Sequence, residues 1–226
     1  MSPRTRFPEV ALFDLDGTLL DSAPDMAATV NRMRAAREQG PMPLEQLRPH
    51  VSKGSRAMSA AAFPELGGEV GSEMIREFLD IYEHELGRNS VLFDGVPELL
   101  DAIEAAGSRW GIVTNKPEYL AKQVLPQLGW DTRSAILIGG DTLPQRKPHP
   151  LPLLHSAEQL GVAIEDCVYV GDDQRDIDAA RAAGMRSIVA LWGYRPEDDD
   201  PNTWGGDVMV GSARDLLAPA LWASLR

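Results

Sequence analysis

The amino-acid sequence predicts an α/β fold, a doubly wound parallel sheet with a small all-helical domain inserted after the first strand. Short apolar runs bounded by turn residues recur along the chain, and most do not alternate with polar residues. That pattern is typical of strands buried on both faces of a sheet. Helical patterns separate most of these runs, as expected of parallel strands joined by crossover helices. One long stretch near the N-terminus contains no strand pattern at all.

The strand and helix patterns alternate from about residue 96 onward. In segment 117–128, for example, Leu120, Val124 and Leu128 recur at a spacing of four residues and predict one buried face of a helix. The predicted strands are 10–15, 110–114, 135–138, 167–170, 187–191 and 208–210. The predicted helices that follow the first strand and its insert are 96–106, 117–128, 151–160 and 173–183.

The stretch 22–88 is predicted to be the helical insert. Phe78, Leu79, Tyr82 and Leu86 form part of an amphipathic stripe within it, and glycine- and proline-containing segments divide it. We interpret the stripe as core packing and not as a cofactor site. The chain therefore divides into a core domain of residues 1–21 and 89–226 and a helical domain of residues 22–88.

Composition excludes several classes of function. The net charge is −12, so the chain offers little material for the basic face of a nucleic-acid-binding protein and is disfavoured at anionic membranes. A single cysteine, Cys167, excludes an intrachain disulfide and a cysteine-based zinc site. No apolar run approaches the roughly 20 residues of a membrane span, and no signal peptide is recognised, so we expect a cytoplasmic protein. No partner protein is evidently required.

The most informative segment follows the first predicted strand. Asp14 and Asp16 stand two residues apart at its carboxyl end, where they are expected to point to the same side, and Gly17 permits a sharp turn. Ligands of open α/β sheets bind at the carboxyl ends of strands. Two carboxylates held so close need a counter-charge, which a hard divalent cation supplies.

A second acidic group follows the strand at 167–170. Asp172 lies at the strand end and is predicted to bind a metal, and Asp176 follows four residues later on the same side. Asp173 has the spacing of a helix N-cap, which we prefer to a catalytic role.

Two further strand ends or helix starts carry polar groups. Thr114 and Asn115 precede a helix whose free amides suit a phosphate group, and Lys147 places a cation before another helix. Thr114 and Asn115 also suit simple helix capping, and Lys147 alone fits a solvated loop. Of the remaining residues, His149 is a substrate contact or a loop residue, Cys167 is a small core residue, and the run 198–200 is expected to be solvated.

These segments together resemble the haloacid-dehalogenase superfamily of phosphatases. The matching motifs are Asp14-Leu15-Asp16-Gly17-Thr18, Thr114-Asn115, Lys147-Pro148-His149-Pro150, and Gly171-Asp172 with Asp176. The helical insert is similar to the type 1 cap of that superfamily, and the core to its Rossmann-like domain. Within it the chain resembles the phosphoglycolate phosphatase group. Segments 51–58, 92–100 and 193–205 resemble the N-acetylmuramic acid 6-phosphate phosphatases of cell-wall recycling.

The resemblance implies an Mg²⁺-dependent phosphatase acting on a small-molecule phosphate ester. Asp14 would attack phosphorus and Asp16 would act as general acid and base. Asp14, the backbone carbonyl of Asp16, Asp172 and Asp176 would hold Mg²⁺, with Asp176 acting through a metal-bound water. Thr114, Asn115 and Lys147 would bind the phosphoryl oxygens.

Three points stay open at this stage. Lys53 and Arg56, on a glycine-containing turn of the helical insert, are predicted to pair with a substrate carboxylate, which 2-phosphoglycolate and N-acetylmuramic acid 6-phosphate both carry. A sugar-phosphate mutase would use the same aspartyl-phosphate. A phospho-receiver or other binding module is disfavoured by the intact set of acids and by the insert.

Overall fold

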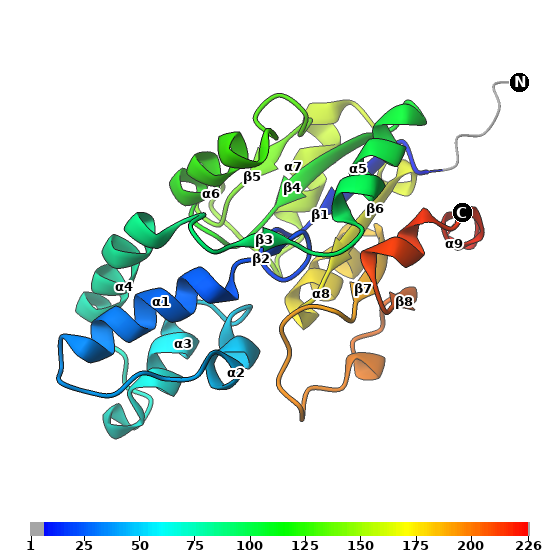
Figure 1. Cartoon of the computed structure of the whole chain (residues 1–226). Coiled ribbons are helices and arrows are strands. Elements are labelled where there is room, and N and C mark those ends of the chain that lie inside the picture. The colour runs from blue at the N-terminus through cyan, green and yellow to red at the C-terminus, as the bar shows by residue number, and fades with distance from the viewer. Residues whose placement is uncertain (1–6, 226) are drawn as a thin grey trace, which may run out of the picture.

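The computed structural model describes residues 7–225 and shows a doubly wound α/β fold built on six parallel strands (Figure 1). The strand order is β5-β4-β1-β6-β7-β8, so β1 lies in the interior of the sheet between β4 and β6. The strands are β1 (Val10–Phe13), β4 (Arg109–Val113), β5 (Leu137–Ile138), β6 (Cys167–Gly171), β7 (Arg186–Ala190) and β8 (Val208–Val210). All six predicted strands are therefore confirmed within three residues at either end.

Helices cover both faces of this sheet, which explains why the strands lack polar alternation. In β1, Val10 and Leu12 pack in the cluster that contains residues of α7 and α8, whereas Ala11 and Phe13 pack on the opposite side with residues of α5. Every residue of β1 is buried. The core helices are α5 (Val96–Ala105), α6 (Glu118–Val124), α7 (Leu151–Leu160), α8 (Gln174–Ala183) and α9 (Pro219–Ala223).

One predicted helix is shorter than expected. The segment 117–128 forms α6 only as far as Val124, and Leu125–Leu128 continues as a 3₁₀ turn. Pro126 stands at the start of that turn. Proline has no amide hydrogen to donate and clashes with the preceding helical turn, so the α-helix ends before it.

The helical insert lies between β2 (Leu20–Asp21) and β3 (Val91–Leu92) and forms the lower left of Figure 1. The two short strands pair antiparallel, with Leu20 opposite Leu92. The sequence did not predict this stem, because two residues are too few to show a periodicity. The insert contains α1 (Ala23–Ala35), α2 (Leu44–Leu47), α3 (Ser55–Ala62) and α4 (Ser72–Glu85). The division at residues 22–88 stays a prediction, and residues 1–6 of the predicted core domain lie outside the described residues.

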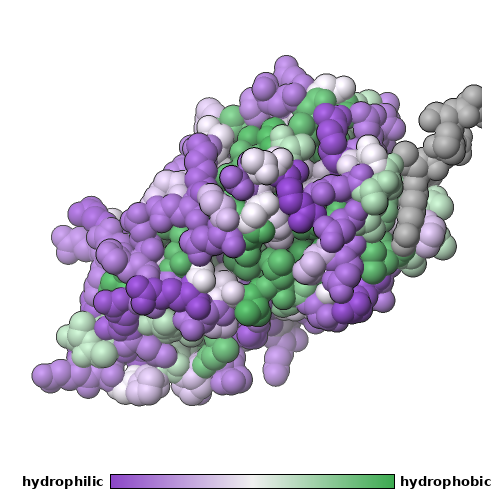
Figure 2. All heavy atoms as spheres, turned by 45° about the horizontal axis from the view of Figure 1, so that its top comes forward, coloured by the Kyte–Doolittle hydropathy of each residue, from purple (hydrophilic) through white to green (hydrophobic). Residues whose placement is uncertain are grey.

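The surface shown in Figure 2 is mostly hydrophilic, with apolar residues visible in areas between hydrophilic ones. Within residues 7–225, no helix is both long enough and apolar enough to cross a bilayer.

A buried carboxylate fastens the insert to its stem. Asp25, in the first turn of α1, is fully buried and accepts hydrogen bonds from the segment that leaves α4. Its donors are the amides of Gly87 (2.8 Å) and Asn89 (2.6 Å), the Asn89 side chain (3.2 Å) and the hydroxyl of Ser90. These contacts join the two chain segments at the base of the insert.

We expect Asp25→Ala to lower the free energy of unfolding by about 3 kcal/mol, because it removes a buried carboxylate that accepts four hydrogen bonds. Urea unfolding followed by circular dichroism measures this. Asp80→Ala, at an exposed position on α4, is the matched control and should change stability by less than about 0.5 kcal/mol. Equal effects of the two substitutions would contradict the role of Asp25.

Candidate active site

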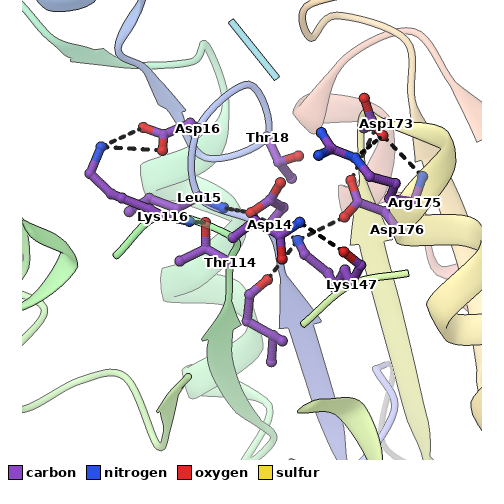
Figure 3. Close-up of polar contacts among 12 residues, drawn as sticks. Asp14, Leu15, Asp16, Thr18, Thr114, Lys116, Lys147, Asp173, Arg175 and Asp176 are labelled. Atoms are coloured by element: carbon purple, nitrogen blue, oxygen red, sulfur yellow. Dashed lines mark hydrogen bonds and ion pairs between the residues drawn. The ribbon is translucent and has the colours of Figure 1, made fainter. Parts of the chain in front are cut away.

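The loops that follow β1, β4 and β6 meet at one edge of the sheet because these strands are parallel neighbours. They carry Asp14, Thr114 and Asp172, which the sequence analysis had placed at strand ends. Figure 3 shows Asp14 at the centre of this edge, between Thr114 and Lys147.

Asp14 is held by its surroundings in one orientation. Its side chain accepts a hydrogen bond from the amide of Leu15 (2.8 Å) and lies 3.1 Å from the ammonium of Lys147. Burial raises the pKa of the Asp14 carboxyl from 3.8 to about 6, although Lys147 opposes the shift. An acid whose charged form is destabilised in this way gains from a nearby cation.

The side chain of Lys147 is buried and fully hydrogen-bonded, so Lys147 is not a solvated loop residue. Its ammonium lies 2.7 Å from Asp176 and 2.9 Å from the carbonyl of Val113, and it donates to the hydroxyl of Tyr169 (2.7 Å). Burial opposes its charge, but Asp14 and Asp176 together raise its pKa above the ordinary value. Lys147 therefore stays charged between the two acids.

Asp14, Asp172 and Asp176 form a buried acidic cluster, with one carboxylate oxygen of each within 4.8 Å of the others. Burial raises the pKa of Asp172 well above its usual range, and the neighbouring charges of Asp14 and Asp176 raise it further. Lys147 offsets only one of the three negative charges. The deficit of two positive charges and the all-oxygen donor set fit a hard divalent cation.

The surroundings of Asp172 leave little space for other side chains. Thr18 donates to one oxygen (2.9 Å), and the amide of Tyr194 and the hydroxyl of Ser52 donate to the other (2.9 and 2.8 Å). Gly17 adopts a φ of +88°, and a Cβ atom at this position would lie 2.3 Å from Asp172. The turn after β1 therefore requires glycine both for its backbone conformation and for this close approach.

The predicted N-cap role of Asp173 is confirmed. Its side chain accepts from the amide of Arg175 (3.0 Å), and Asp176 accepts from the amide of Asp173 (3.0 Å), so the two acids form a capping box for α8. Burial acts to raise the pKa of Asp173, but hydrogen bonds and charge from Arg175 and Lys53 bring it below its usual value. Asp176 thus belongs to both the helix cap and the acidic cluster.

Asp16 does not point to the same side as Asp14, contrary to the sequence-based expectation. Figure 3 shows it turned away, toward Lys116, whose ammonium donates to both of its oxygens (3.1 and 3.2 Å). Lys116 also donates to the hydroxyl of Tyr82 on α4 (2.6 Å). Strand β1 ends at Phe13, so the alternation of a pleated strand no longer governs the side chain of Asp16.

Sequence reasoning missed Lys116 and Tyr82. Lys116 directly follows Thr114 and Asn115 at the end of a strand, and this position was a usable signal. Tyr82 gave none, because an aromatic residue on an amphipathic stripe is ordinarily read as core.

Thr114 and Asn115 both line the site. The hydroxyl of Thr114 accepts from the amide of Lys116 (3.2 Å). Asn115 donates from its side chain to the carbonyl of Lys147 (2.9 Å), and its side-chain oxygen is buried without a hydrogen-bond partner within residues 7–225. Asn115 therefore ties the loop after β4 to the loop that carries Lys147.

The two predicted substrate-binding residues of the insert already have partners. Lys53 lies 2.9 Å from Asp173 and 3.2 Å from Asp199. Arg56 donates to the carbonyl of Val70. The acidic run 198–200 was expected to be solvated, but Asp199 binds Lys53 and accepts from the indole of Trp204 (2.9 Å). The long loop after β7 brings it against the insert.

The site opens into a cavity of about 360 Å³ between the sheet edge and the insert. Its polar lining includes every predicted site residue except Asp172, the member of the acidic cluster that does not reach the cavity wall. The insert contributes an apolar wall. Residues of that wall are Met26, Val51, Met58, Ile75, Phe78 and Leu79. This arrangement suits a ligand with an anionic end at the sheet and a less polar body against the insert.

Comparisons with known proteins agree with this geometry. Residues 11–190 match the family model described as haloacid dehalogenase-like hydrolase. A phosphoglycolate phosphatase of Xanthomonas campestris pv. campestris is 61% identical over 217 residues, which cover 96% of this chain and 98% of that protein. An N-acetylmuramic acid 6-phosphate phosphatase of Pseudomonas aeruginosa is 43% identical over 210 residues, covering 92% and 93% respectively.

A crystal structure of a predicted phosphoglycolate phosphatase from Haemophilus somnus superposes with a TM-score of 0.81. It is 28% identical in sequence, and the match covers 95% of this chain and 98% of that one. The region that matches the family model, residues 11–190, includes the strands and loops that carry Asp14, Lys147 and Asp172. The chain belongs to the haloacid dehalogenase-like hydrolase family.

Proposed function

We propose that this protein is an Mg²⁺-dependent phosphatase that hydrolyses a small phosphate monoester through an aspartyl-phosphate on Asp14. One observation supports this above all. Asp14 lines the cavity between the sheet edge and the insert, beside a buried ammonium and within an acidic cluster in which one ammonium faces three carboxylates. The phosphatases among the relatives carry the same class of activity in their names.

The reaction would proceed in two displacements. An oxygen of Asp14 attacks phosphorus, the ester P–O bond breaks, and Asp16 gives a proton to the departing alcohol oxygen. A water then attacks the aspartyl-phosphate, Asp16 accepts its proton, and inorganic phosphate leaves with Asp14 restored. Thr114, Asn115 and Lys147 would hold the phosphoryl oxygens.

Asp14, Asp172, Asp176 and the backbone carbonyl of Asp16 would hold Mg²⁺ in this proposal, with Asp176 acting through a water. When bound, the cation would supply positive charge that lets an anionic nucleophile approach an anionic phosphate. Lys147 would support the same step, because its charge is fixed between Asp14 and Asp176.

The cavity favours a sugar phosphate over the smallest esters. Ligand pockets of about 300–1,000 Å³ enclose molecules of drug size, and the cavity here has about 360 Å³ and an apolar wall. N-acetylmuramic acid 6-phosphate would fill it, whereas 2-phosphoglycolate would leave the wall uncovered. The second candidate is 2-phosphoglycolate, which the names of the 61% identical relatives favour. Steady-state phosphate release from these two substrates, assayed side by side, tests the choice.

Arg56 is the residue of the insert best suited to a substrate carboxylate. The charge of Lys53 is already offset by Asp173 and Asp199. Arg56 also lines the cavity, but its side chain donates a hydrogen bond to the neutral carbonyl of Val70. A guanidinium whose charge is not offset by an acidic partner can bind a carboxylate through two hydrogen bonds.

We expect Asp14→Asn to lower phosphate release by more than about a thousandfold, because the amide cannot form the phosphoenzyme. The measurement is kcat on the preferred ester, with thermal unfolding to verify folding. Asp80→Asn on the exposed face of α4 controls for loss of a charge. Near-normal turnover by Asp14→Asn would eliminate Asp14 as the nucleophile.

Removal of the metal should abolish phosphate release, and Mg²⁺ should restore it. Its effect on stability should depend on pH. The pKa of Asp14 is raised to about 6 and that of Asp172 is also raised, so the metal-free fold binds protons more tightly than the unfolded chain. The stability of the metal-free fold therefore falls as the pH rises from the ordinary carboxyl pKa of 3.8 through the raised pKa of Asp14 of about 6. Bound Mg²⁺ offsets that loss.

The increase in Tm on adding Mg²⁺ after EDTA treatment should consequently be larger near pH 7.5 than near pH 5. Differential scanning fluorimetry at both pH values measures it. Full activity in EDTA, or a Tm gain that does not increase with pH, would argue against a metal at the acidic cluster.

For the carboxylate contact, Arg56→Ala should raise the activation free energy for N-acetylmuramic acid 6-phosphate by about 1.5–3 kcal/mol, measured through kcat/KM. The effect on p-nitrophenyl phosphate should be much smaller, since that ester carries no carboxylate. Arg76→Ala, also exposed on the insert but outside the cavity lining, is the control. Equal losses on both esters would show that Arg56 does not recognise the carboxylate.

A further inference from the structure

The loop after β4 carries a second buried lysine that the mechanism above does not use. The side chain of Lys116 is only 2% exposed. Its ammonium donates to both oxygens of Asp16 and to the hydroxyl of Tyr82, which accounts for all three of its hydrogens. The ammonium also lies 4.5 Å from the centre of the Tyr82 ring. In this arrangement the donors of Lys116 are directed to Asp16 and Tyr82.

Asp16, in turn, depends on Lys116. Among residues 7–225, the side chain of Asp16 forms hydrogen bonds and an ion pair with Lys116 only, and it is 13% exposed. Within the described part of the chain, no backbone amide or other cation holds this carboxylate in place. Asp14 differs, because it has both Leu15 and Lys147 as partners. Removal of Lys116 would leave Asp16 free to change rotamer.

We propose that Lys116 is the positioning residue for the general acid and base Asp16, and that Tyr82 brings the helical insert into this contact. The inference rests on the proposed phosphatase function. When Asp16 gives its proton to the departing oxygen, it becomes a carboxylate. An ammonium about 3.1 Å away stabilises that product of the proton transfer.

Tyr82 links this pair to the insert. It lies on α4, it is 2% exposed, and its ring and hydroxyl both contact Lys116. Burial, followed by the nearby charge of Asp16, raises the pKa of Tyr82 well above its usual range, so it remains a neutral phenol. The ammonium has its full set of partners only while α4 lies against the core.

The test uses two esters of nearly the same shape. p-Nitrophenyl phosphate releases a weakly basic phenolate that needs little protonation, whereas phenyl phosphate releases a more basic one that needs the general acid. For Lys116→Met, we expect kcat/KM to fall by roughly 10- to 100-fold on phenyl phosphate and by less than about threefold on p-nitrophenyl phosphate. A loss of fold or of substrate binding would affect both esters equally.

Asp16→Asn should show the same dependence on the leaving group. Adding Lys116→Met to Asp16→Asn should then cost less than about twofold more, because the two residues act as a unit. Lys122→Met removes an exposed cation on α6 that pairs with Glu118, and it serves as the matched control with no dependence on the leaving group.

Tyr82→Phe keeps the ring and removes the hydroxyl, so it provides a milder variant if Lys116→Met folds poorly. It should lower kcat/KM on phenyl phosphate by roughly 2- to 10-fold, the effect of one hydrogen bond, and spare p-nitrophenyl phosphate. Equal losses on both esters, or additive losses in the double variant, would overturn the proposed role of Lys116 but not the proposed phosphatase function. A wild-type protein inactive on every ester would overturn the proposed function and this inference with it.

Discussion

The structure depends on burying three carboxylates, two after the neighbouring strands β1 and β6 and one at the start of α8, with a single ammonium among them. Burial destabilises the charged forms of Asp14 and Asp172, as their raised pKa values indicate. Lys147 offsets part of this cost through ion pairs with Asp14 and Asp176. The close turn at Gly17 places further donors around Asp172. Such a site is stable only as a fully connected unit, and the remaining charge deficit is what a divalent cation would supply.

The helical insert is joined to the core through one of these acids, Asp172, and through two further acids, Asp173 and Asp199. Ser52 donates to Asp172, and Lys53 lies between Asp173 and Asp199. Arg175 at the start of α8 donates to the backbone carbonyl of Ser52. The contacts that close the cavity are therefore made by residues of the acidic site and its helix cap. A change of charge at the site would therefore directly change the contacts that hold the insert against the core.

The two acids that follow β1, Asp14 and Asp16, are each paired with a different lysine. Lys147 lies between Asp14 and Asp176, on the side of the acidic cluster. Lys116 holds Asp16 on the other side, toward the insert. This separation keeps two carboxylates that are neighbours in sequence in different surroundings. Two acids with different partners are suited to different tasks, one as nucleophile and one in proton transfer.

The sequence by itself determined the parallel sheet, the helical insert, the strand ends that carry Asp14, Thr114 and Asp172, and the capping box of α8. These features depend on local periodicity and short spacings. Only the tertiary structure decided the direction of Asp16 and its contact with Lys116, which lies 100 residues away. The same holds for Asp199, which is 146 residues from Lys53. Such contacts arise from how loops and helices pack across the sheet edge, and no pattern of neighbouring residues encodes them.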